Sequence, residues 1–510
     1  MANDETFDVC VVGAGLSGLS CADALLEQQP GLRVVVFEIN NRVGGRTKTD
    51  ALAIDGGGHV TVDSGGMWVG PQHREMHKLL ARFGLATVPQ YDHGKHVLVQ
   101  GAAVWKAYEG DIPPHNILSL LELQLRVLAP IDKLAQTVDL LDPSRTPNAA
   151  ALDAQSVASY FGSFLWSRAA RDTVNLVCLA TLGCEASQVS LLQLLYVIKS
   201  CEGLRALIDV RGGAQEARVV GGTQQLSERL AAAVIARGGE VRLGCQVARI
   251  ALAAGGGVEL TVAGNAGDRR VRARAVVSAA IPSVALRQIE FAPRLPSRLE
   301  QVAARTFRGA YAKAVVVYAR PWWRAAGFSG FGTNTEPDVE HCVAFCYDYC
   351  GMQPPAGDAE QFALVCFFCG DVAVRAADLS PEARRASVLA SLQRLFPQHS
   401  DEAGAPVLVH DMLWHRDAVA TGCPVTVFPP GQFRPFALAA TLGRPLASSA
   451  DAAARPVLFF ASTDVSTEWG AYMEGAVRRG LAVAREVRDA LAFAAPPVAP
   501  GEAALAWMSA

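Results

Sequence analysis

The stretch FDVCVVGAGLSGLSCADALLEQQPGLRVVVFE, residues 7–38, decides the fold of this chain. It begins with an apolar run rich in valine, turns at three closely spaced glycines, and continues as an apolar helical pattern. A second valine-rich run then ends at Glu38. The order of strand, glycine turn, helix and strand predicts one βαβ unit of a parallel sheet.

Each of the three glycines has a physical task in such a unit. Gly13 permits the tight turn, Gly15 lets a pyrophosphate approach the backbone, and Gly18 lets the helix pack closely on the strand. The N–H groups at the start of the helix can then bind phosphate. Glu38 can accept hydrogen bonds from both ribose hydroxyls of an adenosine, and it would repel a 2′-phosphate. The stretch therefore predicts a dinucleotide site, and NAD and FAD fit it equally well.

The composition limits the class of protein. With 510 residues the chain is too long for one core and suggests about two domains. Hydrophobic residues make up 51% and charged residues 19%, which is typical of a well-buried globular protein. The net charge of −3 gives no reason to expect nucleic acid or an acidic membrane as partner. No apolar run is long enough for a membrane span, and the acidic N-terminus is unlike a signal peptide, so we expect a cytoplasmic protein without a membrane anchor.

The twelve cysteines lie in apolar sequence contexts, which favours buried free thiols in a reducing compartment. One group allows a zinc site as an alternative: His341, Cys342, Cys346, Cys350, Cys366 and Cys369. The residues between them alternate as in buried strands and lack turn glycines between paired ligands. We therefore predict no metal site.

Two arginines flank a glycine pair in the segment NNRVGGRT, residues 40–47. Such a loop can lie against a pyrophosphate, with Gly45 allowing close approach and Arg42 or Arg46 offering a bidentate contact. The alternative is a plain glycine turn with surface arginines. The position directly after a dinucleotide unit favours the cofactor loop.

A second glycine pair, in DSGGMWVGP, is consistent with backbone at Gly66 and Met67 that passes near a flat ring. The segments GAGLSGL, Glu38, RVGGRT and DSGGMWVGP, in this order, resemble the flavin-containing amine oxidase superfamily, and monoamine oxidases in particular. The resemblance spans roughly residues 6–490. It implies FAD as the cofactor, and an α/β fold. A Rossmann-like, discontinuous FAD-binding domain would be joined by an α+β substrate domain of mixed sheet plus helices.

The resemblance and the element pattern together predict the division of the chain. The FAD-binding domain would consist of residues 1–95, 211–300 and 413–491, the substrate domain of a helical part, 96–210, and a sheet part, 301–412, and the tail of residues 492–510. In the helical part we expect an amphipathic stretch over residues 116–141 that is broken at Pro130. By resemblance, the runs 175–181 and 189–201 line the substrate cavity, with Ser200 where the family has a polar amide.

Lys313 lies in an apolar strand, where a charged amine is costly unless it has a partner or loses its proton. A lysine that only extends its amine to solvent is the alternative from spacing alone. The resemblance instead implies a lysine that holds a water against flavin N5. It also implies that Trp414 and Tyr472 orient the amine beside the flavin.

The remaining family positions concern the cofactor. The resemblance implies that the backbone of Val247 holds the adenine, that Cys423 can bond covalently to the flavin 8α-methyl, and that Asp464 binds the ribityl hydroxyls. Met473 opens a helix whose N-terminus can stabilise negative charge on the flavin. Asp464 is shorter than the glutamate that the family has at this position.

Two departures bear on activity. Monoamine oxidases flank the amine with two tyrosines whose faces attract it. Tyr472 supplies one, but Pro424 stands in place of the other, so half of this aromatic cage is missing. Asn40 replaces the usual arginine after the ribose-binding acid, and the Ala/Pro-rich tail is unlike an apolar membrane anchor.

The sequence thus predicts an FAD-dependent amine oxidase that converts a primary or secondary monoamine to imine and aldehyde while O2 is reduced to H2O2. One alternative is a polyamine or L-amino-acid oxidase, with Glu185 and Arg308 as candidate substrate-binding groups. Another is a weakly active FAD-binding interaction protein. The physiological amine, the covalent link, a homodimer and the organelle stay open.

Overall fold

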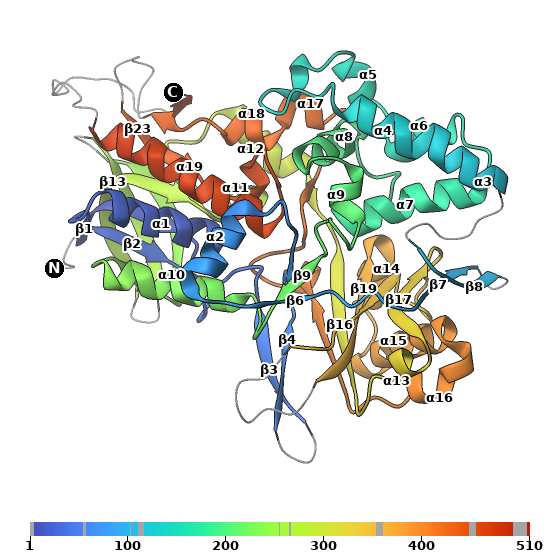
Figure 1. Ribbon diagram of the computed structural model, residues 1–510. Coiled ribbons are helices and arrows are strands. Elements are labelled where there is room, and N and C mark those ends of the chain that lie inside the picture. The colour runs from blue at the N-terminus through green and yellow to red at the C-terminus, as the bar shows by residue number, and fades with distance from the viewer. Residues whose placement is uncertain are drawn as a thin grey trace.

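The computed structural model describes residues 5–54, 58–101, 104–110, 117–253, 256–264, 267–352, 361–447, 455–492 and 507–509. Two large sheets dominate this part of the chain, one of ten strands and one of seven. Figure 1 shows the first at the left with α1, α10 and α19, and the second at the lower right. A group of helices lies above the seven-stranded sheet.

The predicted βαβ unit is present. It consists of β1 (Glu5–Val12), α1 (Leu16–Gln28) and β2 (Val34–Phe37). The two strands are parallel, with Val9 opposite Val34. All four residues of β2 are buried, which explains why this strand is continuously apolar rather than alternating.

The ten-stranded sheet has the central order β10-β2-β1-β13-β12-β11-β14. The long strand β13 (Arg269–Ser278) pairs in parallel with β1, and its opposite edge is shared by two strands. β12 (Val258–Gly264) pairs antiparallel with its first half, and β23 (Pro456–Phe460) pairs in parallel with its end. The other strands of this sheet are β10 (Glu240–Arg242), β11 (Cys245–Leu252), β14 (Glu290–Ala292), β22 (Leu446–Ala447) and β24 (Met508–Ser509). The predicted Rossmann-like sheet is confirmed.

Helices α10 (Gln224–Ala236) and α19 (Met473–Ala492) pack on α1. A Cβ atom on Gly480 would lie 2.3 Å from the carbonyl oxygen of Ser17, so α19 can approach α1 only because this residue is glycine. This contact brings the C-terminal helix to the N-terminal unit. The first residue of α19, Met473, lies against Gly66, where an added Cβ atom would be 3.7 Å from the Met473 side chain.

The seven-stranded sheet has the order β20-β16-β19-β18-β17-β7-β8. Its strands are β7 (Lys95–Gln100), β8 (Val104–Tyr108), β16 (Tyr311–Tyr318), β17 (Phe328–Asn334), β18 (Phe345–Asp348), β19 (Phe362–Cys369) and β20 (Leu408–Leu413). β16 lies between β19 and β20, antiparallel to both, and Lys313 is opposite Phe367. The segment 96–210 therefore opens with two strands before its helices. The division into domains at the predicted boundaries stays a prediction.

The expected helix break at Pro130 is replaced by a different irregularity. α3 (Ile117–Glu122) continues through a π-helical turn, Leu123–Leu128, into α4 (Ala129–Ala135), with Pro130 in the first turn of α4. A wider turn tolerates the missing N–H of proline, so the direction of the chain is kept. Residue 116 lies outside the described residues.

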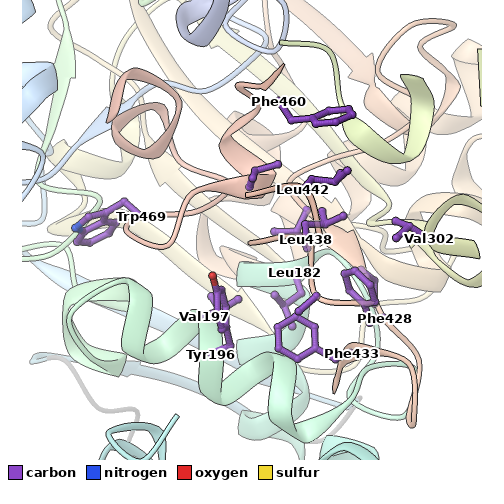
Figure 2. Close-up of a cluster of buried hydrophobic side chains, with 14 of the residues drawn as sticks. Leu182, Tyr196, Val197, Val302, Phe428, Phe433, Leu438, Leu442, Phe460 and Trp469 are labelled. Carbon is purple, nitrogen blue, oxygen red and sulfur yellow. The ribbon is translucent and has the colours of Figure 1, made fainter. Parts of the chain in front are cut away.

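The helical group further contains α5 (Ala149–Asp153), α6 (Val157–Gly162), α7 (Arg168–Leu182), α8 (Leu191–Ser200) and α9 (Leu204–Ile208). Figure 2 shows the core that these helices share with the C-terminal segments. There the Tyr196 ring lies 5.3 Å from the Phe433 ring, which lies 5.3 Å from the Phe428 ring. Most of the α8 side chains are buried in this core.

The remaining strands in the described part of the chain form three small sheets, and further helices flank the large ones. The strands are β3 (Thr49–Ala53), β4 (His59–Asp63), β5 (Trp68–Val69), β6 (Thr87–Pro89), β9 (Ala217–Val219), β15 (Phe307–Arg308) and β21 (Thr426–Val427). The helices are α2 (Arg74–Phe83), α11 (Pro282–Gln288), α12 (Ser297–Arg305), α13 (Trp322–Ala325), α14 (Gly370–Ala376), α15 (Pro381–Leu395), α16 (Ser400–Ala403), α17 (Phe433–Phe436) and α18 (Leu438–Leu442). Across the described ranges, no helix combines the length and the apolar character that crossing a membrane requires.

The twelve cysteines are unpaired, and ten of them are buried. Within the described residues, no three His, Cys, Asp or Glu side chains are grouped so that they could hold a metal ion. Of the predicted tail, residues 493–506 and 510 lie outside the described residues. Its end is not a free tail, because β24 pairs antiparallel with β22 at the edge of the ten-stranded sheet.

Candidate active site

A cavity of about 370 Å³ extends from the glycine turn after β1 to the face of the seven-stranded sheet. Fourteen residues predicted from the sequence lie in its wall: Gly13, Gly15, Glu38, Arg42, Gly45, Arg46, Gly66, Met67, Val247, Lys313, Trp414, Cys423, Tyr472 and Met473. Gly18 and Asp464 do not line it. Residues from three distant parts of the chain therefore meet around one space.

The glycine turn is shaped for a close backbone approach. Gly13 has φ +106°, a left-handed conformation that favours glycine. A Cβ atom on Gly15 would contact only the carbonyl oxygen of Gly44, at 3.8 Å, so the space above this residue is open. A Cβ atom on Gly18 would lie 2.0 Å from the carbonyl oxygen of Gly13. Gly18 therefore serves the packing of helix on turn rather than the cavity wall.

Glu38 is held in place by its neighbours. Its Oε2 accepts a hydrogen bond from the backbone N–H of Ala14 at 2.8 Å, and its Oε1 accepts two from Asn40, at 3.0 and 2.8 Å. Asn40, which stands in place of the family's arginine, thus orients this carboxylate. Oε2 keeps a further lone pair for a ribose hydroxyl.

The two predicted arginines differ in their partners. Arg42 donates to the carbonyls of Val43 and Gly45, at 3.2 and 2.8 Å, and so braces its own loop. Burial lowers the pKa of Arg42, and the charge of Glu38 opposes this shift. Arg46 reaches across the chain to the carbonyl of Pro424 at 2.7 Å.

Asp464 lies behind the cavity wall, between two arginines. Its Oδ2 accepts from Arg46 at 3.0 Å, and its Oδ1 accepts from Arg308 at 2.8 Å. Burial opposes ionisation, but the two guanidinium groups hold the pKa of this carboxyl well below its usual range. The predicted contact of Asp464 with ribityl hydroxyls has no support in this placement. Ser462 and Thr463 line the cavity instead.

Lys313 is buried, and its Nζ donates to three acceptors. The carbonyl oxygens of Asp63 and Gly65 lie at 2.8 and 2.5 Å, and the Met67 sulfur lies at 3.4 Å. Burial lowers the pKa of Lys313 to about 8, although the Asp63 carboxylate opposes this shift. A thioether is a weak acceptor, so the third N–H is available to a water molecule in the cavity.

The aromatic residues at this end are fixed by their surroundings. The Trp414 indole donates to the carbonyl of Ser64 at 2.8 Å. The Tyr472 ring lies 5.2 Å from the Trp469 ring at 85° and 5.8 Å from the His73 ring. Trp469 and Ala471 have positive φ values of 50° and 72°, a strained backbone directly before α19. Such strain persists where the surrounding structure holds the residues in place.

Sequence reasoning missed several residues of the wall, among them Trp68, Gln215, Tyr311 and Phe367. Gln215 Nε2 donates to the carbonyl of Leu207 at 3.2 Å, and its Oε1 is buried without a partner. Tyr311 lies two residues before Lys313, so the period of two along a strand could have identified it. For Gln215, in an irregular segment, there was no such signal.

Other expected cavity residues lie elsewhere. Ala180 and Thr181 line the cavity, but α8 does not, and Ser200 Oγ donates to the carbonyl of Val197 at 3.0 Å. Tyr196, Val197 and Ser200 of α8 instead line a smaller second cavity, which shares Ala471 with the first. That α8 contributes to the substrate cavity therefore stays a prediction. Of the two candidate groups for other substrates, Arg308 pairs with Asp464, and Glu185 accepts from Asn175 at 2.7 Å. Neither lines the cavity.

The wall fits an elongated dinucleotide that carries a flat ring. The wall combines the Glu38 carboxylate, the bulged backbone at Val247, the N-terminus of α1 with the open space above Gly15, and the N-terminus of α19. Helix N-termini favour negatively charged groups. FAD would therefore be held by Glu38, Gly15 and the first residues of α19.

Comparisons with known proteins agree with this site. A sequence model of the family of flavin-containing amine oxidoreductases matches residues 16–488. The mouse protein named amine oxidase (flavin-containing) B is 30% identical over 491 residues, which cover 95% of this chain and 86% of the mouse protein. The structure of cyclohexylamine oxidase from Brevibacterium oxydans is 32% identical, with a TM-score of 0.82 over 95% of this chain and 99% of that one. Putrescine oxidase bound to putrescine is 30% identical, with a TM-score of 0.81 and the same coverage.

Proposed function

Because the chain belongs to the family of flavin-containing amine oxidoreductases, we propose that it oxidises a primary or secondary monoamine to the imine, which hydrolyses to the aldehyde. The observation that carries this proposal is the reactive end of the cavity. There, the rings of Tyr311, Phe367, Trp414 and Tyr472 lie in the wall together with Lys313. When bound, FAD supplies the acceptor for the hydride equivalent and passes the electrons to O2, which becomes H2O2.

The residues of this chain bind and orient the amine. The rings of Tyr472 and Trp414 lie in the cavity wall together with Lys313, and the amine binds beside them. The third N–H of Lys313 contacts only the weakly accepting sulfur of Met67 and is available to a water molecule at the same end. The amine arrives neutral and needs no protein base, because its lone pair is free when the Cα–H bond breaks.

The charges of the wall favour a monoamine over other amine substrates. Among the described residues of the wall, the carboxylates are Glu38 and Asp417. Glu38 lies at the adenosine end, and Asp417 Oδ1 accepts from the backbone N–H groups of Val419 and Ala420, at 3.0 and 2.7 Å. A second ammonium group therefore has no evident counter-charge in front of Lys313. Similarity to putrescine oxidase keeps a diamine as the second candidate.

A peroxide assay tests the proposal. The FAD-loaded protein is mixed in air with a panel of monoamines, with putrescine and longer polyamines, and with L-amino acids. We expect H2O2 with at least one monoamine and a lower kcat/KM for diamines. Greater activity on diamines would favour the second candidate. If the yellow, FAD-loaded protein produces no H2O2 with any substrate, the oxidase function is refuted, and an FAD-binding interaction protein is the remaining candidate.

We further propose that Cys423 bonds covalently to the flavin. Its side chain lines the cavity, and Arg46, Arg308 and Lys313 all favour the thiolate. Burial still dominates and raises the pKa of Cys423 to about 11, so we expect the link to form slowly at neutral pH. After acid precipitation the pellet should be yellow for the wild type and colourless for Cys423→Ser. A colourless wild-type pellet would show that FAD is bound only noncovalently.

A further inference from the structure

The amine-binding end has a gap where the sequence places Pro424. This residue lines the cavity but carries no aromatic ring, so Tyr472 alone was expected to present an aromatic face to the amine. A single ring leaves the opposite side of a small amine without an electron-rich surface. The structure places another tyrosine at this gap.

Tyr311 begins β16, two residues before Lys313. Because side chains alternate along a strand, the two residues point to the same face, and both line the cavity. Tyr311 also lies directly beside Pro424. A Cβ atom on Gly183 would be 3.1 Å from Tyr311 Cδ2 and 3.2 Å from Pro424 Cδ, so the ring and the proline flank one point.

The Tyr311 ring is held firmly in this position. Its hydroxyl donates to the carbonyl of Ala180 at 2.7 Å, and the ring lies 5.8 Å from the Phe367 ring at 67°. Gly183, with φ +69°, leaves room for the ring at the end of α7. Since the backbone of Ala180 occupies the hydroxyl, what Tyr311 offers the cavity is its ring.

We propose that Tyr311 supplies the second aromatic wall of the amine site, in place of the ring that is missing at position 424. This inference rests on the proposed amine oxidase function and identifies a residue that determines its affinity for small amines. Tyr472, directly before α19, provides the first wall, and Tyr311, on β16, provides the second. The second wall of the aromatic cage therefore comes from β16 rather than from position 424.

Binding without turnover tests the proposal first. tert-Butylamine has no hydrogen on its α carbon and cannot be oxidised, but its binding can be followed by the change in flavin absorbance. We expect Tyr311→Leu to weaken this binding at least tenfold and Tyr311→Phe to stay within about twofold of the wild type. Tyr318→Leu is the matched control, because Tyr318 is a buried tyrosine of the same strand that lies outside the cavity wall and donates to the carbonyl of Ala403 at 2.9 Å.

Anaerobic reduction of the flavin by cyclohexylamine and benzylamine is the second measurement. Tyr311→Leu should lower the rate at subsaturating amine at least tenfold, and Tyr318→Leu should leave it unchanged. The double variant Tyr311→Leu/Pro424→Tyr should regain part of the loss, because the new ring would enter the space that Tyr311 vacates. If Tyr311→Leu loses FAD, Tyr311→Met is used instead, because methionine also fills the site without an aromatic face.

The outcomes separate this inference from the proposed function. If amines reduce the flavin of the wild type and Tyr311→Leu binds and reacts equally well, only the role of Tyr311 is overturned. Equal losses in Tyr311→Phe and Tyr311→Leu also overturn it, because the hydroxyl would then matter. If the leucine and methionine variants both lose FAD, the ring supports the cavity rather than the amine. If the wild type binds tert-butylamine through Tyr311 but no amine reduces its flavin, only the oxidase function is refuted. If the wild type neither binds tert-butylamine nor is reduced by amines, the oxidase function and the role of Tyr311 are both refuted.

Discussion

At the scale of single residues, Asp464 shows how charge is balanced behind the cavity. Its side chain and that of Arg308 are 2% and 3% exposed, so neither charge is hydrated. Replacing Asp464 by Asn leaves the buried Arg308 without a counter-charge, which typically costs about 3–5 kcal/mol. We expect a much lower urea midpoint for Asp464→Asn, whereas the exposed control Asp401→Asn should behave as the wild type.

The same carboxylate predicts a dependence of stability on pH. The pKa of Asp464 is lower in the folded than in the unfolded protein, so its contribution is present above the unfolded value of about 4. It is lost as the pH falls below that value and through the folded pKa. Urea midpoints at pH 3 and pH 7 should therefore differ less for Asp464→Asn than for the wild type. Equal differences would contradict the ion pair.

Lys313 predicts a pH effect on the reaction with oxygen. With a pKa of about 8, it is a cation at pH 7 and neutral at pH 9. A cation stabilises negative charge that develops on oxygen, so reoxidation should slow as the pH rises through about 8. Lys313→Met should react about a hundredfold more slowly and without this pH dependence.

This reaction can be measured without an amine. The flavin is reduced with dithionite and mixed with O2 in a stopped-flow instrument. The exposed residue Lys133 provides the control variant, Lys133→Met. Rapid reoxidation of Lys313→Met at every pH would show that Lys313 has only a structural role.

At the scale of elements, the chain end provides a strand of the ten-stranded sheet. Just before β24, Trp507 is 2% exposed, and its indole donates to the carbonyl of Pro293 at 2.6 Å. The ring also lies 6.4 Å from the Phe291 ring. Replacing a buried tryptophan by alanine typically costs about 3–5 kcal/mol, so Trp507→Ala should unfold at a lower temperature. Trp166→Ala, at a position 59% exposed, should not. Equal midpoints for both variants would show that this strand adds no stability.

At the scale of the whole molecule, the cavity unites distant segments. Gly13 and Arg46, Val247, and Trp414 and Tyr472 lie in its wall together with Lys313. A ligand that binds only the assembled wall stabilises the folded state by mass action, by about 2.7 kcal/mol at a hundred times its Kd. We expect the flavin-free protein to melt at a lower temperature and to recover with added FAD, but not with NAD. An equal shift with NAD would contradict the assignment of the cofactor site.

The sequence by itself determined the features that depend on neighbouring residues. The βαβ unit, the tasks of its glycines and the position of Glu38 follow from spacing over about thirty residues, because turns and alternation are local properties. The motifs also indicated the family, which the comparisons confirm. The cavity wall contains most of the residues that these motifs singled out.

Only the tertiary structure decided what faces the cavity from distant elements. In the folded chain α8 faces the core, Asp464 pairs with Arg308, and Tyr311 lies beside Pro424. These outcomes depend on how sheets and helices pack, which spacing along the chain does not encode. The ring that the motif at Pro424 lacks lies in a strand more than a hundred residues earlier, and only packing places it there.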